Sequence, residues 1–248
     1  MTIAIASVLV FLFTTVLTIA GVGAAFIIIP TFYWLGVPLT EAMAVALLLN
    51  AISMTFASVN YVRYRLVAFK TAIPIIMLAI IFSPLGAYST RYFSKEFLIL
   101  AFAAFLLFAG SMMLFYTPPT KKDGVSSSSK ELRTGIGLGI GAGYLGGLLG
   151  VGGGNFIVPV LVWLGFDSKR ASATTAFIVI FSSLSGFFGH AAMGNINWQL
   201  LLFSTIGSVA GAVVGSWLMH RKLDARQVKR IIGVVLYAIA IKMLWELL

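Results

Sequence analysis

Long apolar runs, separated by short polar or charged loops, dominate the chain of 248 residues. A helix needs about 20 apolar residues to cross a bilayer. The pattern predicts ten apolar segments, of which the second and the seventh are too short to cross. Their limits are residues 3–20, 24–35, 40–61, 67–90, 95–115, 133–149, 155–164, 171–190, 197–219 and 226–247. We therefore expect an all-α integral membrane protein.

Both short segments follow a glycine-rich stretch. Residues 150–165 read GVGGGNFIVPVLVWLG, and residues 21–36 read GVGAAFIIIPTFYWLG. Glycine permits positive φ and close approach of the backbone to a ligand. At membrane depth, irregular backbone is tolerated only inside protein or along a cavity. We interpret each short segment as a broken or re-entrant helix that follows a glycine-rich turn.

The two stretches belong to a longer internal repeat. The halves align without gaps at an offset of 129 positions, since 150 − 21 = 129. Matched residues include Gly21 with Gly150, Gly23 with Gly152, Pro30 with Pro159, Trp34 with Trp163, Ser53 with Ser182 and Gly86 with Gly215. The polar stretch 117–132 is expected to be a cytoplasmic linker between an N-terminal repeat, 1–116, and a C-terminal repeat, 133–248. Five segments per half is an odd number, so the second repeat should be inverted relative to the first.

The basic residues test this topology. Of the 17 Lys and Arg residues, the ten segments place 14 on one side and three on the other, namely Arg91, Lys95 and Lys242. The positive-inside rule makes the richer side cytoplasmic. We therefore expect a multi-pass protein of the cell (inner) membrane with both termini outside. The net charge of +10 is explained by these loops, and no nucleic-acid partner is expected.

Composition narrows the class further. The chain is 60% hydrophobic and 10% charged, with a mean hydropathy of +1.04. A soluble domain of this size could not bury so much apolar surface. The absence of cysteine excludes disulfides, a thiol nucleophile and thiolate metal sites. The first segment is interpreted as a membrane helix and not as a signal peptide, and we expect no cofactor and no metal.

The glycine turns suggest anion binding. A helix that begins near Asn155 would direct unpaired N–H groups and a partial positive charge into the protein. The candidate substrate-binding residues here are Gly152, Gly153, Gly154 and Asn155, with Gly21 and Gly23 as the counterparts in the first half. The alternative is that these glycines only allow close helix packing.

Hydroxyl and amide side chains extend the candidate site. Segment 171–190 contributes Thr174, Thr175 and Ser182, and segment 40–61 contributes Asn50 and Ser53. Such groups can replace the water shell of an oxyanion. For each single hydroxyl, a bond to a carbonyl of its own helix or of a neighbouring helix is the competing interpretation.

Titratable groups are scarce within the segments. All seven Asp and Glu residues lie in loops or near segment ends, which disfavours a carboxylate proton relay and suits an anion path. His190 is expected at the outer interface without a transport role, and His220 on the cytoplasmic surface.

Further glycine patterns are interpreted as packing faces. Gly141, Gly143 and Gly146 match a dinucleotide fingerprint in spacing, but they lie in an apolar run without a preceding strand. The series Gly135, Gly139, Gly143, Gly147 and the series Gly207, Gly211, Gly215 predict close helix approach.

The two-copy glycine motif resembles that of the sulfite exporter TauE/SafE family. The C-terminal copy has Gly150, Gly152, Gly153, Gly154, Pro159, Leu161 and Gly165, followed by residues 171–175. In the N-terminal copy, Ala24 and Ala25 replace two motif glycines. The resemblance implies a secondary transporter for small sulfur-containing anions, such as sulfite, sulfoacetate or related organosulfonates.

The leading hypothesis is thus a transporter that works by alternating access, with the two broken helices meeting near the bilayer midplane. An anion channel is the main alternative. A membrane-embedded enzyme is disfavoured, because the segment centres lack Asp, Glu, His and Cys. The expected partners are a small anion and the lipid bilayer, and the sequence is compatible with a homo-oligomer.

Overall fold

The computed structural model describes residues 2–21, 23–115, 128–192 and 198–245, which form ten α-helices and no strand. The first half contains α1 (Thr2–Ala20), α2 (Ala25–Trp34), α3 (Leu39–Arg63), α4 (Phe69–Ser89), the 3-10 helix η1 (Thr90–Tyr92) and α5 (Lys95–Phe115). The second half contains α6 (Ser128–Leu148), α7 (Gly154–Trp163), α8 (Ser168–Ala191), α9 (Trp198–Arg221) and α10 (Ala225–Trp245). All ten predicted segments are confirmed as helices, although α6 begins earlier than predicted.

Length and apolar composition together distinguish the helices that could cross a membrane. Among the described residues, four helices are long and apolar enough to cross a membrane: α3 from residue 41, α4, α8 and α9. The helices α2 and α7 have ten residues each, about half of what a crossing requires. Large apolar side chains on the outer surface, such as Val59, Met77, Phe188 and Ile206, suit a lipid environment.

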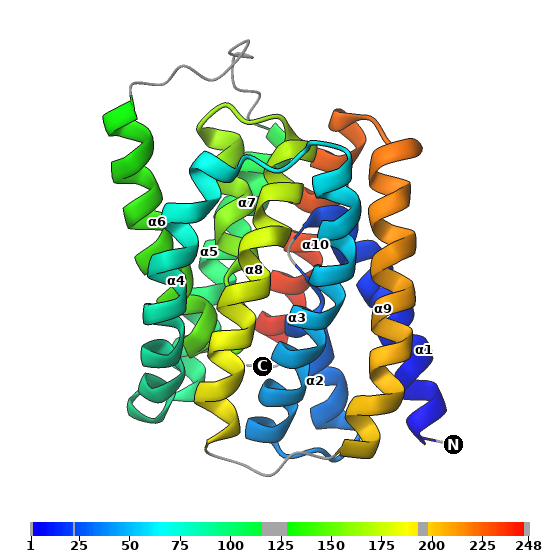
Figure 1. Ribbon diagram of the computed structural model, residues 1–248. Helices are drawn as coiled ribbons and strands as arrows, with labels where there is room; N and C mark the ends of the chain where they lie inside the picture. The colour runs from blue at the N-terminus through cyan, green and yellow to red at the C-terminus, as the bar shows by residue number, and fades with distance from the viewer. Residues whose placement is uncertain (1, 22, 116–127, 193–197, 246–248) are drawn as a thin grey trace.

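Each short helix forms a hairpin with the helix before it (Figure 1). The helix α1 rises from the N-terminus near the lower edge of the view, and α2 returns to that edge, where α3 begins. The helix α6 begins at the upper edge, and α7 returns to that edge, where α8 begins. The two hairpins therefore open on opposite faces of the molecule.

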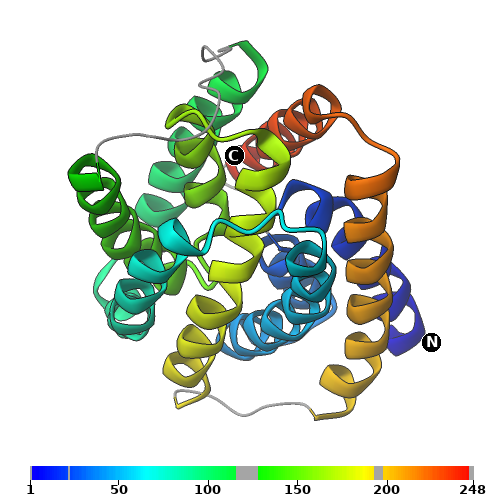
Figure 2. The same ribbon diagram turned by 45° about the horizontal axis from the view of Figure 1, so that its top comes forward.

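The helices of the two halves pack mainly against each other. The helix α1 lies along α9, α6 along α4, α3 along α8 and α5 along α10. Figure 2 shows α3 and α8 near the middle, between α1 with α9 on one side and α4 with α6 on the other. Of the four membrane-crossing helices, α3 and α8 are the most buried, so both halves build one shared core.

Glycine faces bring the outer helix pairs close together. The glycines concerned are Gly207, Gly211 and Gly215 on α9, which face α1, and Gly139, Gly143 and Gly147 on α6, which face α4. A Cβ at Gly215 would overlap the carbonyl oxygen of Thr15, and one at Gly147 would overlap that of Ser83. The predicted packing role is confirmed for these glycines. Gly135 differs, because a Cβ there would make only ordinary contacts.

Candidate functional site

Two glycine-rich turns inside the protein join α1 to α2 and α6 to α7. In the first turn, Gly21 and Gly23 have φ of 72° and 78°. In the second, Gly150, Gly152 and Gly153 have φ of 69°, 74° and 79°. Any residue with a Cβ atom would be strained at these positive φ angles. The predicted breaks between the helices are confirmed, and the glycines are needed for the turns themselves.

Each turn packs against the central helix of the other half. A Cβ at Gly21 would overlap the backbone of Ser172 on α8, whose hydroxyl donates to the carbonyl oxygen of Ala20 at 3.1 Å. A Cβ at Gly150 would lie 2.9 Å from Cγ of Met43 on α3. Both pairs of positions differ by 129, since 150 − 21 and 172 − 43 give the same number. The two contacts join equivalent positions of the halves, although Gly21 meets the backbone of Ser172 and Gly150 meets the side chain of Met43.

Asn50 of α3 lies between the two turns and is fully buried. Its Oδ1 accepts a hydrogen bond from the N–H of Ala24 at 3.1 Å, and its Nδ2 donates to Oγ of Ser183 at 2.9 Å. Because a backbone N–H can only donate, the bond to Ala24 fixes the orientation of the amide. A Cβ at Gly23 would overlap Oδ1, and one at Gly152 would lie 3.1 Å from Nδ2. The amide therefore directs its oxygen to the first turn and its nitrogen to the second.

Two neighbouring serines of α8 hold the second turn. Oγ of Ser182 donates to the carbonyl oxygen of Gly152 at 2.6 Å. Oγ of Ser183 lies against Cα of Gly152, where a Cβ would overlap it. Ser182 is among the predicted site residues and Ser183 is not. The sequence signal that could have identified Ser183 is its position next to Ser182, since both hydroxyls contact Gly152.

The start of α7 presents buried polar groups without protein partners. No side chain within the described residues caps this helix, whose N-cap is Gly153. The N–H of Phe156 donates to the carbonyl oxygen of Gly153 at 3.1 Å, so the N–H groups before Phe156 are the ones without an acceptor in the helix. Asn155 is fully buried, and neither Oδ1 nor Nδ2 has a hydrogen-bond partner in the described part of the chain. Pro159 lacks the N–H that would bond to the carbonyl oxygen of Asn155. This turn combines unpaired donors with the positive end of a helix.

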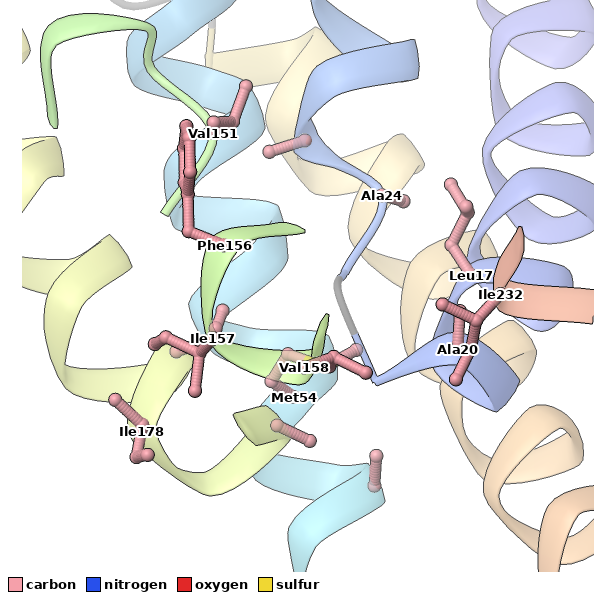
Figure 3. Packing of buried hydrophobic residues seen from close by; sticks show 14 of the residues in the cluster. Leu17, Ala20, Ala24, Met54, Val151, Phe156, Ile157, Val158, Ile178 and Ile232 are labelled. Carbon is pink, nitrogen blue, oxygen red and sulfur yellow. The ribbon is translucent and has the colours of Figure 1, made fainter. Parts of the chain in front are cut away.

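Apolar side chains enclose the turns (Figure 3). Leu17, Ala20 and Ala24 lie around the first turn, and Val151 and Phe156 lie around the second. Polar interactions are stronger in such surroundings than in water. An unpaired amide there is correspondingly unfavourable.

The remaining predicted hydroxyls have different neighbours. Oγ1 of Thr175 is fully buried and has no partner among the described residues. Oγ1 of Thr174 accepts from the N–H of Ala68 at 3.0 Å, which ties the connection between α3 and α4 to α8. Oγ of Ser53 donates to the carbonyl oxygen of Asn50 in its own helix at 3.1 Å. The structure brings Asn50 and Ser182 to the turns, while Thr174 and Ser53 are bonded to backbone groups.

The two histidines have different surroundings. His190 lies in the last turn of α8, as expected from the sequence, but its side chain is only 1% exposed, and Nε2 lies 2.9 Å from the carbonyl oxygen of Gly147 on α6. The end of α6 covers this part of α8, which helix position alone does not reveal. His220 stacks on Tyr64 with ring centroids 3.6 Å apart and lies next to Lys169, whose Nζ donates to its carbonyl oxygen at 3.4 Å.

The buried centre is polar but uncharged in the described ranges. The buried polar residues there include Ser, Thr, Asn and His but no Asp, Glu, Lys or Arg. No group of three or more His, Asp or Glu side chains among the described residues could hold a metal ion. Asp167, an exposed acid, caps α8 by accepting from the N–H groups of Lys169 and Arg170.

These features define a multi-pass helical membrane protein in which two helical hairpins, each with a glycine-rich turn, meet at the buried side chains of Asn50, Ser182 and Ser183. The sequence model of the sulfite exporter TauE/SafE family matches residues 6–243. The chain belongs to this family and is a membrane transporter of the TauE/SafE type. The resemblance noted from the glycine motif is confirmed.

Similar proteins carry names of the same kind. The probable membrane transporter protein YunE of Bacillus subtilis is 26% identical over 94% of this chain and 93% of its own length. The probable membrane transporter protein MJ0441 of Methanocaldococcus jannaschii is 33% identical over 43% of this chain and 42% of its own. A probable membrane transporter protein of Haemophilus influenzae is 26% identical over 70% and 68%. No solved structure matches the chain.

Proposed function

We propose that the protein is a secondary transporter that moves small sulfur-containing anions, such as sulfite, sulfoacetate or related organosulfur anions, across the cytoplasmic membrane by alternating access. The observation that carries the proposal is the amide of Asn155, which is fully buried without a partner among the described residues. Buried polar groups normally have hydrogen-bond partners. An anion bound at the start of α7 would accept a hydrogen bond from Nδ2 of Asn155.

The chemistry of this site favours an anion. The oxygens of a sulfite or sulfonate group accept hydrogen bonds, and the first N–H groups of α7 and Nδ2 of Asn155 are donors. The helix N-terminus adds about 0.3–1 kcal/mol of attraction, and up to about 2 kcal/mol when partly buried. No carboxylate is buried in the described part of the chain, so no fixed negative charge there opposes such a ligand. Membership of the TauE/SafE family supports sulfur-containing anions as the class.

Alternating access is supported by the relation between the halves. The hairpins open on opposite faces (Figure 1), and the reciprocal contacts of Gly21 with Ser172 and of Gly150 with Met43 are those expected of two inverted repeats. In such transporters, one repeat moves against the other around a site near the midplane. The bias of basic residues to the linker side favours that side as cytoplasmic, with both termini outside.

The test is binding of sulfite and sulfoacetate to the purified chain in detergent, with chloride as the reference anion. Asn155→Leu removes both amide groups at similar volume and should weaken binding by about ten-fold or more, which corresponds to about 1.4 kcal/mol. Asn60→Leu is the matched control, because Asn60 bonds to Ser216 at 2.9 Å away from the turns. Wild-type affinity in the Asn155 variant would refute the site.

Flux into proteoliposomes then separates a transporter from a channel. A transporter should give flux that saturates with sulfite concentration, because each cycle requires a bound anion. A current that rises without saturation would show a channel and refute alternating access.

A further inference from the structure

The two turns have matching backbones but different amides. Asn50 and Val179 occupy equivalent positions of α3 and α8, since 179 − 50 = 129, as do Ala24 and Gly153. In the first half, Oδ1 of Asn50 accepts from the N–H of Ala24 at 3.1 Å. In the second half, Val179 is fully buried, and its side chain has no group that accepts a hydrogen bond. The N–H of Gly153 therefore has no side-chain acceptor equivalent to the one that Asn50 gives to the N–H of Ala24.

We propose that Asn50 acts as a built-in substitute for the anion at the first turn, so that the chain has one anion site, at the start of α7, and not two. The inference rests on the proposed function. The carboxamide oxygen of Asn50 takes the N–H of Ala24, as an oxyanion would. The same oxygen lies against Cα of Gly23, where a Cβ would overlap it, much as Oγ of Ser183 lies against Gly152 in the second turn.

The opposite end of the same amide favours an anion at the second turn. Nδ2 of Asn50 carries two N–H groups, of which one donates to Oγ of Ser183 at 2.9 Å. The same nitrogen would lie 3.1 Å from a Cβ on Gly152, so the positive end of the amide dipole lies beside the second turn. The negative end lies at the first turn, where it disfavours an anion.

The start of α7 has a second, independent mark of a ligand site. Asn155 is the second residue of α7. It is fully buried and has no partner for either amide atom in the described residues. The equivalent position in the first half is Phe26, since 155 − 26 = 129, and a phenylalanine side chain has no hydrogen-bonding group. Both differences between the halves point to α7 as the single anion site.

A purely structural role for Asn50 makes a different prediction. If Asn50 only connects the first hairpin to α8, then a new amide at position 179 should leave anion binding unchanged. If an amide at this position competes with the anion, Val179→Asn should cap Gly153 and exclude the ligand. This variant therefore separates the two roles.

The experiment is isothermal titration of the full purified chain with sulfite and with sulfoacetate. We expect one anion per wild-type chain and binding weakened by about ten-fold or more in Val179→Asn. Val179→Thr is the matched control, because threonine has the shape of valine and its short hydroxyl bonds within its own helix. Wild-type affinity in Val179→Asn, or two anions per wild-type chain, would overturn the proposal.

The outcomes distinguish this inference from the proposed function. If the wild type binds neither probe, or if Asn155→Leu binds like the wild type, the proposed function fails. If Asn155→Leu loses binding and Val179→Asn keeps it, only the role of Asn50 fails. Should Val179→Asn not fold, the stoichiometry of the wild type still decides, because two anions per chain would overturn a single site.

Discussion

Replacing Asn155 by leucine should make the protein more stable while it weakens anion binding. Asn155 lies in the first turn of α7, is fully buried and has no partner for Oδ1 or Nδ2 among the described residues. The residues that follow it in α7, Phe156, Ile157 and Val158, are buried and apolar. Leucine has a similar volume and no polar atom, so it suits these surroundings better.

The size of the effect follows from two opposing contributions. A buried donor or acceptor that lacks a partner costs about 1–3 kcal/mol, and the amide has one of each. Branching at Cγ puts the methyl groups of leucine near the positions of the amide atoms, but imperfect packing still costs about 1 kcal/mol. The net expectation is a gain of about 2 kcal/mol. For a chain of this size, that corresponds to a rise in melting temperature of about 4–8 °C.

The assay is thermal unfolding of the ligand-free protein in one detergent at one scan rate. Asn50→Leu is the matched control, since Asn50 is equally buried but has partners in Ala24 and Ser183. That variant leaves the N–H of Ala24 unpaired and should lose about 2–4 kcal/mol. If Asn155→Leu melts below the wild type, as Asn50→Leu should, the Asn155 amide is satisfied within the protein and the argument for a ligand there is refuted.

Two further predictions concern the framework of the site. Gly211→Ala should destabilise the protein by about 1–3 kcal/mol, because a Cβ there would lie 2.5 Å from the carbonyl oxygen of Phe11. Gly137→Ala is the control: nothing lies within 4 Å of its Cβ, so it should be neutral or stabilise α6 by up to about 1 kcal/mol. Equal melting temperatures of the two variants would contradict the close α1–α9 contact. Asp167→Ala should lower the free energy of unfolding by about 1 kcal/mol, because α8 loses its N-cap. Asp167→Asn should keep most of this stability, and denaturant unfolding measures both variants.

The helices and their breaks were predictable because they depend on local properties. Segment length and hydrophobicity identify a helix at membrane depth, since its backbone must be satisfied within the segment. The breaks near Gly21 and Gly150 were also predictable locally, because glycine is the residue that adopts positive φ without strain. The packing of Gly211 and Gly215 on α1 followed from their spacing of four residues on one helix face.

The partners of the polar side chains were not predictable, because they depend on tertiary packing. Asn50 bonds to Ala24, 26 residues away, and to Ser183, 133 residues away. Nothing in the local sequence of Asn50 indicates that its amide spans the two turns. Likewise, the bond of Thr174 to the backbone of Ala68 and the burial of His190 under α6 depend on how helices from different halves meet.

The bond between Asn50 and Ser183 has a consequence for the proposed transport cycle. Asn50 belongs to the first half and Ser183 to the second, so movement of one half against the other must stretch or break this contact. One hydrogen bond contributes about 1 kcal/mol net, which is less than a ten-fold change in a population. The contact can therefore bias the choice between two states without preventing the change. Asn155 differs because it belongs to α7 itself, so an anion bound there can move with the hairpin.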